Sequence, residues 1–181
     1  KSGTIGTIKD VEATFTKLVP ETSRELSDKF SGGSMTELSS YVLLPILKIF
    51  GDNYKSLQFY SYYNQGVDLF TKGVMEYPNG TASFKVGLGV KSEGCLIISG
   101  TKGYAYVPAP WWKTDYFELR FEDMSQNRKY YYRFDGDGLR YELEEFISLI
   151  ANYQKESYRL SQKGSIEIAR IIEKFRSNQD L

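Results

Sequence analysis

The sequence predicts an α+β domain in which helices cover one face of an open, mostly antiparallel β-sheet. The order of the patterns supports this fold class. A strand pattern and a helix pattern come first, six or seven strand patterns follow in a row, and two helix patterns close the chain. Strands that follow one another directly favour antiparallel pairing, because a short turn can join them. At 181 residues the chain is long enough for one domain with a sizeable core.

The chain begins with a strand, a polar loop and a helix. Residues 8–19 alternate apolar and polar side chains, which is typical of a half-buried strand. Residues 20–33 form a polar loop, and a helix is expected over residues 35–50. Its apolar stripe follows spacings of three and four, through Met35, Leu38, Val42, Ile46 and Ile49. This stripe is the surface that the helix should bury.

The middle of the chain consists of strand patterns. We expect strands over residues 56–63, 67–77, 82–90, 94–99, 104–108, 115–121 and 130–134. Asn79-Gly80 is a favoured hairpin turn between the second and third of these. In the strand after that turn, the side chains expected to face the core are Ala82, Phe84, Val86, Leu88 and Val90.

The last quarter changes to the helical period. After the cap-like pair Asp137-Gly138, apolar residues recur at helical spacing at Leu139, Leu143, Phe146, Ile147 and Ile150. Residues 165–178 form a second amphipathic pattern, for which Ser165 is the expected N-cap. Both helices are expected to pack on the face of the sheet that the first helix covers.

The composition excludes several classes of function. Lys plus Arg and Asp plus Glu both number 23, so the net charge is zero, which argues against a nucleic-acid surface. The absence of histidine excludes Ser-His-Asp triads, histidine metal sites and histidine bases within this chain. A single cysteine, Cys95, excludes an internal disulfide and favours a cytoplasmic protein. The longest apolar run, residues 41–50, is too short for a membrane span, so no membrane partner is expected.

Two groups of residues are candidates for chemistry or binding. Glu37 and Tyr41 are four positions apart and share one face at the start of the first helix. They are interpreted either as a functional pair, or as a first-turn carboxylate favoured by the helix dipole beside a half-buried packing residue. Trp111, Trp112 and Lys113 lie in a proline-rich loop, where they line a ligand pocket, form a protein interface or simply pack.

Three segments together resemble the C-terminal domain of the Gfo/Idh/MocA oxidoreductases, the glucose-fructose oxidoreductase and inositol dehydrogenase family. The first is the start, "SGTIGTIKDVEATFT", which is similar to the lead into the first strand of that domain. The second is "GGSMTELSSYVLLPILKIFG", similar to the family's Gly-Gly-x-Leu-x-Asp-x-Gly-x-His/Tyr helix. The third is "LIISGTKGYAYVPAPWW" followed by "DGDGLRYELEEFISLI". The resemblance spans nearly the whole chain.

The resemblance implies a division of labour between two domains. Residues 1–181 correspond to a single substrate-binding and dimerisation domain, and the family's N-terminal Rossmann domain, which binds NAD or NADP and carries a Glu-Lys-Pro motif, is absent from this chain. The implied reaction is hydride transfer on a sugar, cyclitol or sugar derivative. The implied assembly is a homodimer through the open face of the sheet, and the isolated chain is expected to be inactive.

Two residues carry the family's functional positions. Tyr41 falls on the His/Tyr position and would be the proton relay or hydroxyl anchor, while Glu37 falls on the Asp position and would orient its neighbours. Trp111, Trp112 and Lys113 would contact the substrate. Glu37 in place of Asp, Ser39 in place of Gly and Thr36 in place of an apolar residue depart from the family pattern.

Two other classes of function remain open at this point. The first is a non-catalytic binding or scaffold protein that uses the open sheet face. The second is a hydrolase that uses a pair of carboxylates. Glu118 and Glu122 do not offer such a pair, because they lie on separate faces or ends of one expected strand.

Overall fold

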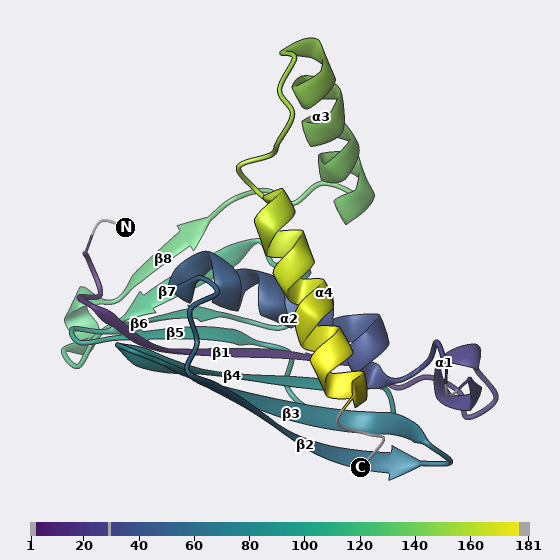
Figure 1. The fold of residues 1–181 in the computed structure, drawn as a ribbon. Coiled ribbons are helices and arrows are strands. Elements are labelled where there is room, and N and C mark those ends of the chain that lie inside the picture. The colour runs from purple at the N-terminus through teal and green to yellow at the C-terminus, as the bar shows by residue number, and fades with distance from the viewer. Residues whose placement is uncertain (1–2, 29, 178–181) are drawn as a thin grey trace.

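The chain forms one open, twisted sheet with helices on one side (Figure 1). A computed structural model describes residues 3–28 and 30–177. The eight strands are β1 (Ile8–Thr16), β2 (Ser56–Asn64), β3 (Val67–Tyr77), β4 (Gly80–Gly87), β5 (Leu96–Gly100), β6 (Tyr104–Val107), β7 (Tyr116–Arg120) and β8 (Arg128–Tyr131). The predicted fold class is confirmed.

The sheet is antiparallel except at one pair of strands. Its order is β2-β3-β4-β1-β5-β6-β7-β8, and β1 runs parallel to β4 while every other neighbouring pair is antiparallel. The parallel pair arises because the chain leaves β1 through a helix and returns by the β2-β3-β4 meander, whose last strand lies against β1. Because they are parallel, β1 and β4 have their C-terminal ends at the same end of the sheet.

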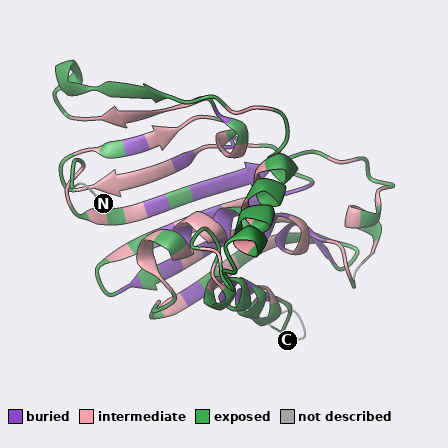
Figure 2. Ribbon diagram, turned by 90° about the horizontal axis from the view of Figure 1, so that it is seen from above, coloured by how far each residue is buried: buried purple, intermediate pink, exposed green. Residues whose placement is uncertain are grey.

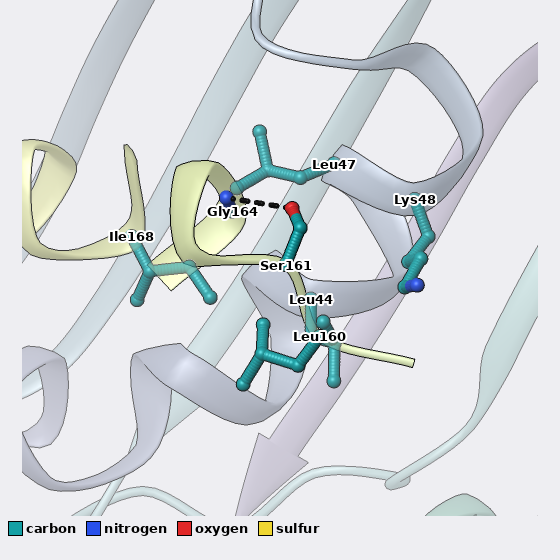
Figure 3. A pocket seen from close by; sticks show the side chains of 7 residues that line it. All are labelled: Leu44, Leu47, Lys48, Leu160, Ser161, Gly164 and Ile168. Atoms are coloured by element: carbon teal, nitrogen blue, oxygen red, sulfur yellow. Dashed lines mark hydrogen bonds between the residues drawn. The ribbon is translucent and has the colours of Figure 1, made fainter. Parts of the chain in front are cut away.

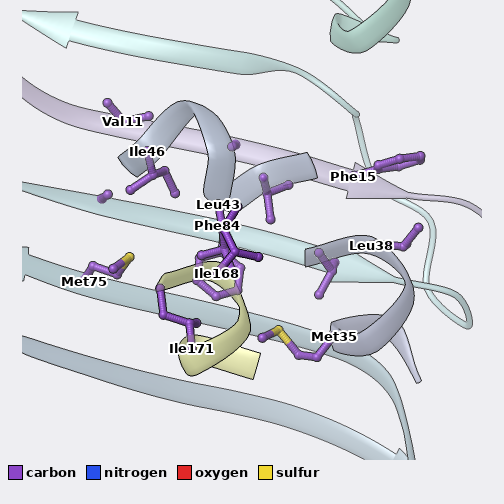
Figure 4. Packing of buried hydrophobic residues seen from close by; sticks show 14 of the residues in the cluster. Val11, Phe15, Met35, Leu38, Leu43, Ile46, Met75, Phe84, Ile168 and Ile171 are labelled. Carbon is purple, nitrogen blue, oxygen red and sulfur yellow. The ribbon is translucent and has the colours of Figure 1, made fainter. Parts of the chain in front are cut away.

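Two long helices form the core with the central strands. The helices are α1 (Arg24–Ser27), α2 (Ser34–Phe50), α3 (Gly138–Ala151) and α4 (Gln162–Ser177), with short 3-10 turns at Trp111–Lys113 and Met124–Gln126. The core side chains of α2 and α4 interdigitate above Phe84 and Met75 (Figure 4). The α2 stripe is buried as predicted at Met35, Leu38, Val42 and Ile46, and Ile49 is partly buried. Burial of this apolar surface is the main force that holds the helices on the sheet.

Helix α3 does not cover the sheet, so the prediction for this helix is wrong. It stands away from the strands (Figure 1), and none of its residues is buried. The five apolar residues predicted to pack on the sheet, Leu139, Leu143, Phe146, Ile147 and Ile150, are 51–63% exposed. In Figure 2 the buried residues gather on the central strands and beneath α2 instead. The helical pattern was therefore correct, but its apolar face has no partner among the described residues.

Several predicted boundaries are also wrong. β4 ends at Gly87, so Val90 lies beyond the strand and is exposed rather than inward-facing. β8 begins at Arg128, not at residue 130, because a tight turn after Asp123 brings Arg128 directly opposite Leu119. The predicted loop over residues 20–33 contains the short helix α1.

The start of α4 differs from the prediction as well. The helix begins at Gln162, three residues before Ser165. Ser161 is the cap, because its Oγ accepts a hydrogen bond from the backbone N–H of Gly164 at 3.1 Å. Asn178, at the end of the predicted helix, lies outside the described residues.

Across the parts of the chain that the structure describes, no helix combines the length and the apolar character needed to cross a membrane.

Candidate functional site

The first turn of α2 is held in place by a buried carboxyl group on β3. Asp68 Oδ2 accepts hydrogen bonds from the Met35 backbone N–H at 3.0 Å and from Thr71 Oγ1 at 2.8 Å. Ser34 Oγ donates to the Asp68 carbonyl oxygen at 2.9 Å. Burial raises the pKa of Asp68 to about 6, although these hydrogen bonds oppose the shift. The start of α2 is therefore fixed against the sheet.

Tyr41 lies two turns into this fixed helix, at the border between core and solvent. Its side chain is 48% exposed, as expected for a residue that flanks the buried stripe. The ring packs edge-on against Phe15 of β1, with ring centroids 4.8 Å apart and planes at 86°. This contact fixes the plane of the Tyr41 ring and leaves part of its side chain exposed to solvent.

Glu37 does not share this contact. Its carboxylate forms an ion pair with Arg24 of α1, with Arg24 Nη2 2.5 Å from Glu37 Oε1. The structure therefore directs Glu37 toward α1 and Tyr41 toward Phe15, although both lie on one side of α2. Its predicted role beside Tyr41 stays a prediction.

Trp112 continues the aromatic contact that begins at Tyr41. Its ring stacks on Phe15 with a centroid distance of 3.7 Å and an interplanar angle of 26°. Tyr41, Phe15 and Trp112 thus form a row of three rings, which we call the aromatic row. Trp111 packs perpendicular to Trp112, and its Nε1 donates to the Thr14 carbonyl oxygen at 3.0 Å. Trp111 thereby ties the tryptophan loop to β1.

Two surface hollows flank Trp112, each with a volume of about 440 Å³. The lysine hollow is lined by Phe15, Lys17, Lys91, Pro110 and Trp112, among others. The arginine hollow lies on the other side of the loop and includes Trp111, Trp112, Tyr141, Arg133 and Arg159. Both volumes fall in the range of small-molecule sites.

Lys113 is the predicted site residue that lines neither hollow. Its Nζ lies 3.0 Å from Asp137 Oδ1, at the start of α3. Asp137 therefore uses its carboxylate to hold the tryptophan loop and makes no side-chain cap on α3. The structure gives Lys113 an anchoring contact, and its predicted contact with substrate stays untested.

Two further hollows lie elsewhere. One, of about 510 Å³, is formed on the helix side of the sheet by apolar side chains of β5 to β8, including Phe117, Leu119 and Tyr130, beside Lys48. The other lies between α2 and the start of α4, where Leu44, Leu47 and Ile168 surround Ser161 (Figure 3). At about 70 Å³ it has room for a few water molecules but not for a sugar.

Phe15, Lys17 and Lys91 line the lysine hollow but are not among the residues that the sequence predicted for a site. Phe15 belongs to the half-buried strand pattern and is 8% exposed, but one face of its ring carries Trp112. Lys17 and Lys91 are 74 positions apart in the sequence. They line the same hollow because the parallel strands β1 and β4 have their C-terminal ends side by side. No local motif could have signalled that meeting.

The carboxylates considered for a hydrolase are not arranged as a catalytic pair. Glu118 lies 2.7 Å from Arg120 and 3.6 Å from Lys129. A hydrogen bond from Arg120 lowers the pKa of Glu118, and Lys129 adds to this effect. Glu118 is therefore held as a structural ion pair. Among residues 3–28 and 30–177 no group of three acidic or cysteine side chains is arranged to hold a metal ion.

Comparison with known proteins matches the chain to one family. The sequence profile described as GFO/IDH/MocA C-terminal domain matches residues 1–106. Among curated proteins, the trans-1,2-dihydrobenzene-1,2-diol dehydrogenases of Oryctolagus cuniculus and Sus scrofa are each 26% identical to this chain across 96% of its length. The chain spans about half the length of these relatives, 55% and 54%.

Solved structures share the fold. The UDP-N-acetylglucosamine 3-dehydrogenase from Acidithiobacillus ferrooxidans superposes with a TM-score of 0.72 at 15% identity, over 94% of this chain and 54% of that one. A 3-ketoreductase from Actinomadura kijaniata, in complex with TDP-benzene and NADP, gives 0.72 at 13% identity, over 94% and 52%. Levoglucosan dehydrogenase, in complex with NADH and levoglucosan, gives 0.72 at 16% identity, over 94% and 56%.

Proposed function

Because this chain belongs to the GFO/IDH/MocA family, we propose that it is the substrate-binding half of an NAD(P)-dependent oxidoreductase that acts on a sugar, cyclitol or related diol. The aromatic row carries this proposal. It places the exposed phenol of Tyr41 beside a surface of stacked rings, with a hollow of sugar size next to it. Relatives of similar fold bind a nicotinamide cofactor together with levoglucosan or a TDP ligand, which supports the substrate class.

The chemistry of alcohol oxidation defines a role for Tyr41. When a carbinol carbon gives up hydride, the proton of its hydroxyl group must also leave. We assign the Tyr41 hydroxyl to that proton, as a relay or as the anchor of the substrate oxygen. A phenol is a weak base near neutral pH, so a cation near the bound substrate must assist it. Trp112 would stack its ring on the apolar face of the sugar. Glu37 would hold α1 close to the start of α2 through its ion pair with Arg24.

The described residues do not fit a dinucleotide. A pyrophosphate cradle needs a glycine-rich turn between a strand and the N-terminus of a helix. Gly87 ends β4 and Gly89 lies in the loop that leads to β5. At Gly32-Gly33, before α2, the Met35 N–H is already bound by the Asp68 carboxyl group. The cofactor, which would accept or supply the hydride, is therefore assigned to a separate nucleotide-binding domain.

The exposed apolar face of α3 supports a second domain. Five large apolar side chains in one row are more than a stable surface helix normally leaves uncovered. We infer that the nucleotide-binding domain packs on this face. The length of the relatives, of which this chain spans about half, is in keeping with such a domain.

The decisive experiment uses the complete gene product that contains this chain. It is assayed with NAD and NADP against neutral sugars, cyclitols and trans-dihydrodiols by the absorbance of the reduced nicotinamide. Tyr41→Phe should lower kcat by about a hundredfold, as loss of a positioned proton-transfer group does. The Tm should hardly change, since the ring contact with Phe15 remains.

Tyr62→Phe is the matched control, because Tyr62 is a similarly exposed tyrosine on β2. It should keep full activity. Normal turnover of Tyr41→Phe would assign Tyr41 to packing. Binding of sugars without turnover with either cofactor would favour the alternative, a non-catalytic binding protein.

A further inference from the structure

The lysine hollow is positively charged although the chain as a whole is neutral. Lys17 follows the last residue of β1, and Lys91 lies in the loop after β4. None of the eight residues that line the hollow is acidic. The aromatic ring of Trp112 forms one wall. This combination of two ammonium groups and a ring differs from the arginine hollow, in which Arg159 is paired with Glu145.

Partly buried hydrogen bonds hold Lys91 beside the hollow. Its Nζ donates to the Thr16 carbonyl oxygen at 3.0 Å. The buried Thr16 side chain in turn fixes the next residue, since its Oγ1 donates to the Ser92 carbonyl at 3.0 Å and accepts from the Ser92 N–H at 2.9 Å. Gly94 lies beside the ring of Trp112, where an added Cβ would be in ordinary van der Waals contact at 3.4 Å. The loop is therefore held against β1, and the Lys91 ammonium group, which uses one donor on Thr16, has two further donors.

Neither lysine is neutralised by the protein. Within the described ranges, no carboxylate lies within 4.0 Å of the Lys17 or Lys91 ammonium group. A backbone hydrogen bond lowers the pKa of Glu25 in α1, and the charge of Lys17 adds to this effect, but the two side chains form no ion pair. A pair of unpaired cations beside a ring is suited to a ligand that carries its own negative charge.

We propose that the lysine hollow binds an anionic substituent, a phosphate ester or a carboxylate, on the sugar-like substrate. Lys17 and Lys91 bind the anion through charge-assisted hydrogen bonds, while the sugar ring lies on Trp112 and reaches toward Tyr41. The assignment to a sugar rests on the proposed function, whereas the anion site rests on the two lysines themselves. The substrate class is accordingly narrowed from neutral sugars to charged sugar derivatives.

Binding to the 181-residue chain tests this proposal without any cofactor. Trp111 and Trp112 are its two tryptophans, so their fluorescence reports on the hollow. Glucose, glucose 6-phosphate and glucuronate are titrated at low salt, and the preferred anion distinguishes a phosphate site from a carboxylate site. We expect at least one anionic sugar to bind more tightly than glucose, with an affinity that falls as salt is added.

The variants Lys17→Met and Lys91→Met should each weaken binding of the anionic sugar by about tenfold, since a hydrogen bond to a charged group contributes on the order of 1.5 kcal/mol. Binding of glucose should not change. Lys102→Met, in the exposed turn between β5 and β6, is the control and should bind like the wild type.

The proposal is overturned if glucose binds as tightly as both anionic sugars, if neither anionic sugar binds, or if the double variant keeps the preference for the anion. These outcomes are separate from those for the proposed function. Turnover of neutral diols by the complete gene product, without a preference for anions, would remove the anion site alone. If the anionic sugar binds but the complete gene product transfers no hydride, the proposed oxidoreductase function is contradicted and the anion site is supported.

Discussion

At the scale of single residues, Asp68 anchors the start of the helix that carries Glu37 and Tyr41. It is 3% exposed and accepts the backbone N–H of Met35 at the start of α2. Gly33, just before the helix, has a φ of +98°, and an added Cβ would lie 2.2 Å from Asp68 Oδ1. The close approach of this backbone to a carboxylate requires glycine. Asp68 and Gly33 together therefore fix the position of α2 and, with it, the positions of Glu37 and Tyr41.

Replacing Asp68 with Asn should remove a pH dependence of stability. Burial raises the pKa of Asp68 to about 6 in the folded protein, above the ordinary aspartate pKa of about 4, so the folded state holds this proton more tightly than the unfolded state. The contribution to stability is therefore complete below about pH 4 and is lost as the pH rises through about 6. Asn cannot ionise and keeps an oxygen for the Met35 N–H.

The measurement is urea denaturation of both proteins from about pH 4 to pH 7. The free energy of unfolding of Asp68→Asn, relative to the wild type, should rise by about 2 kcal/mol over that range. Glu142→Gln, an exposed carboxylate on α3, is the control and should follow the wild type. Parallel curves for Asp68→Asn and the wild type would show that Asp68 does not titrate in this range.

Residues such as Asp68 explain what sequence reasoning could not find. The position of Tyr41 beside the buried stripe of α2 was predicted from helical spacing alone, whereas its chemical role rests on the family resemblance and stays a prediction. Asp68 lies 33 residues from its partner Met35, and Phe15 lies 97 residues from Trp112. Such pairs meet only through the strand order, and one sequence does not encode that order locally. The residues on one element were predictable, and the contacts between elements were not.

At the scale of elements, α3 and α4 show the limit of a helical pattern. Both carry an apolar face in the sequence. α4 buries Ile168, Ile171 and Phe175 against α2 and the sheet, whereas α3 buries nothing. Periodicity reveals that a helix has an apolar face, but not whether the partner of that face belongs to the same domain.

Two matched substitutions should separate these helices. Ile171→Ala removes a fully buried side chain and leaves a cavity, so it should lower the free energy of unfolding of the 181-residue chain by about 2 to 4 kcal/mol. Ile147→Ala removes the same atoms from α3, where the side chain is 63% exposed, and should change stability by less than about 0.5 kcal/mol. Chemical denaturation measures both. Equal losses would mean that α3 is packed in solution.

At the scale of the whole molecule, the sequence predicted the class of fold better than its topology. A hairpin between β3 and β4 was predicted correctly, but its turn residues are Pro78 and Asn79 rather than Asn79 and Gly80, because Gly80 already pairs with Tyr77. The parallel pairing of β1 with β4 was not foreseen, because it depends on the crossover through α2 rather than on either strand alone. That pairing also forms the lysine hollow. The unexpected part of the topology is thus the part on which the proposed anion site depends.

The face of the sheet opposite the helices bears on assembly. Tyr60 and Tyr62 of β2 and Tyr104 of β6 are exposed there. On β7, Arg120 covers the ring of Tyr106, with its guanidinium 4.4 Å from the ring centroid. The face thus carries exposed aromatic rings, in which interfaces are enriched, together with charged side chains such as Glu12, Lys72 and Lys85.

We therefore expect the 181-residue chain to form a homodimer through this face. In a two-fold interface each patch meets its own copy, so one lysine introduced per chain places two like charges together. Light scattering should give a dimer for the wild type and a monomer for the double variant Tyr60→Lys and Tyr104→Lys. Leu143→Lys on the exposed face of α3 is the control and should remain dimeric. A wild-type monomer at high concentration would contradict the prediction. If Leu143→Lys gives a monomer and the double variant on the sheet stays dimeric, the dimer interface lies on α3. That outcome would also contradict our assignment of the nucleotide-binding domain to the same face of α3.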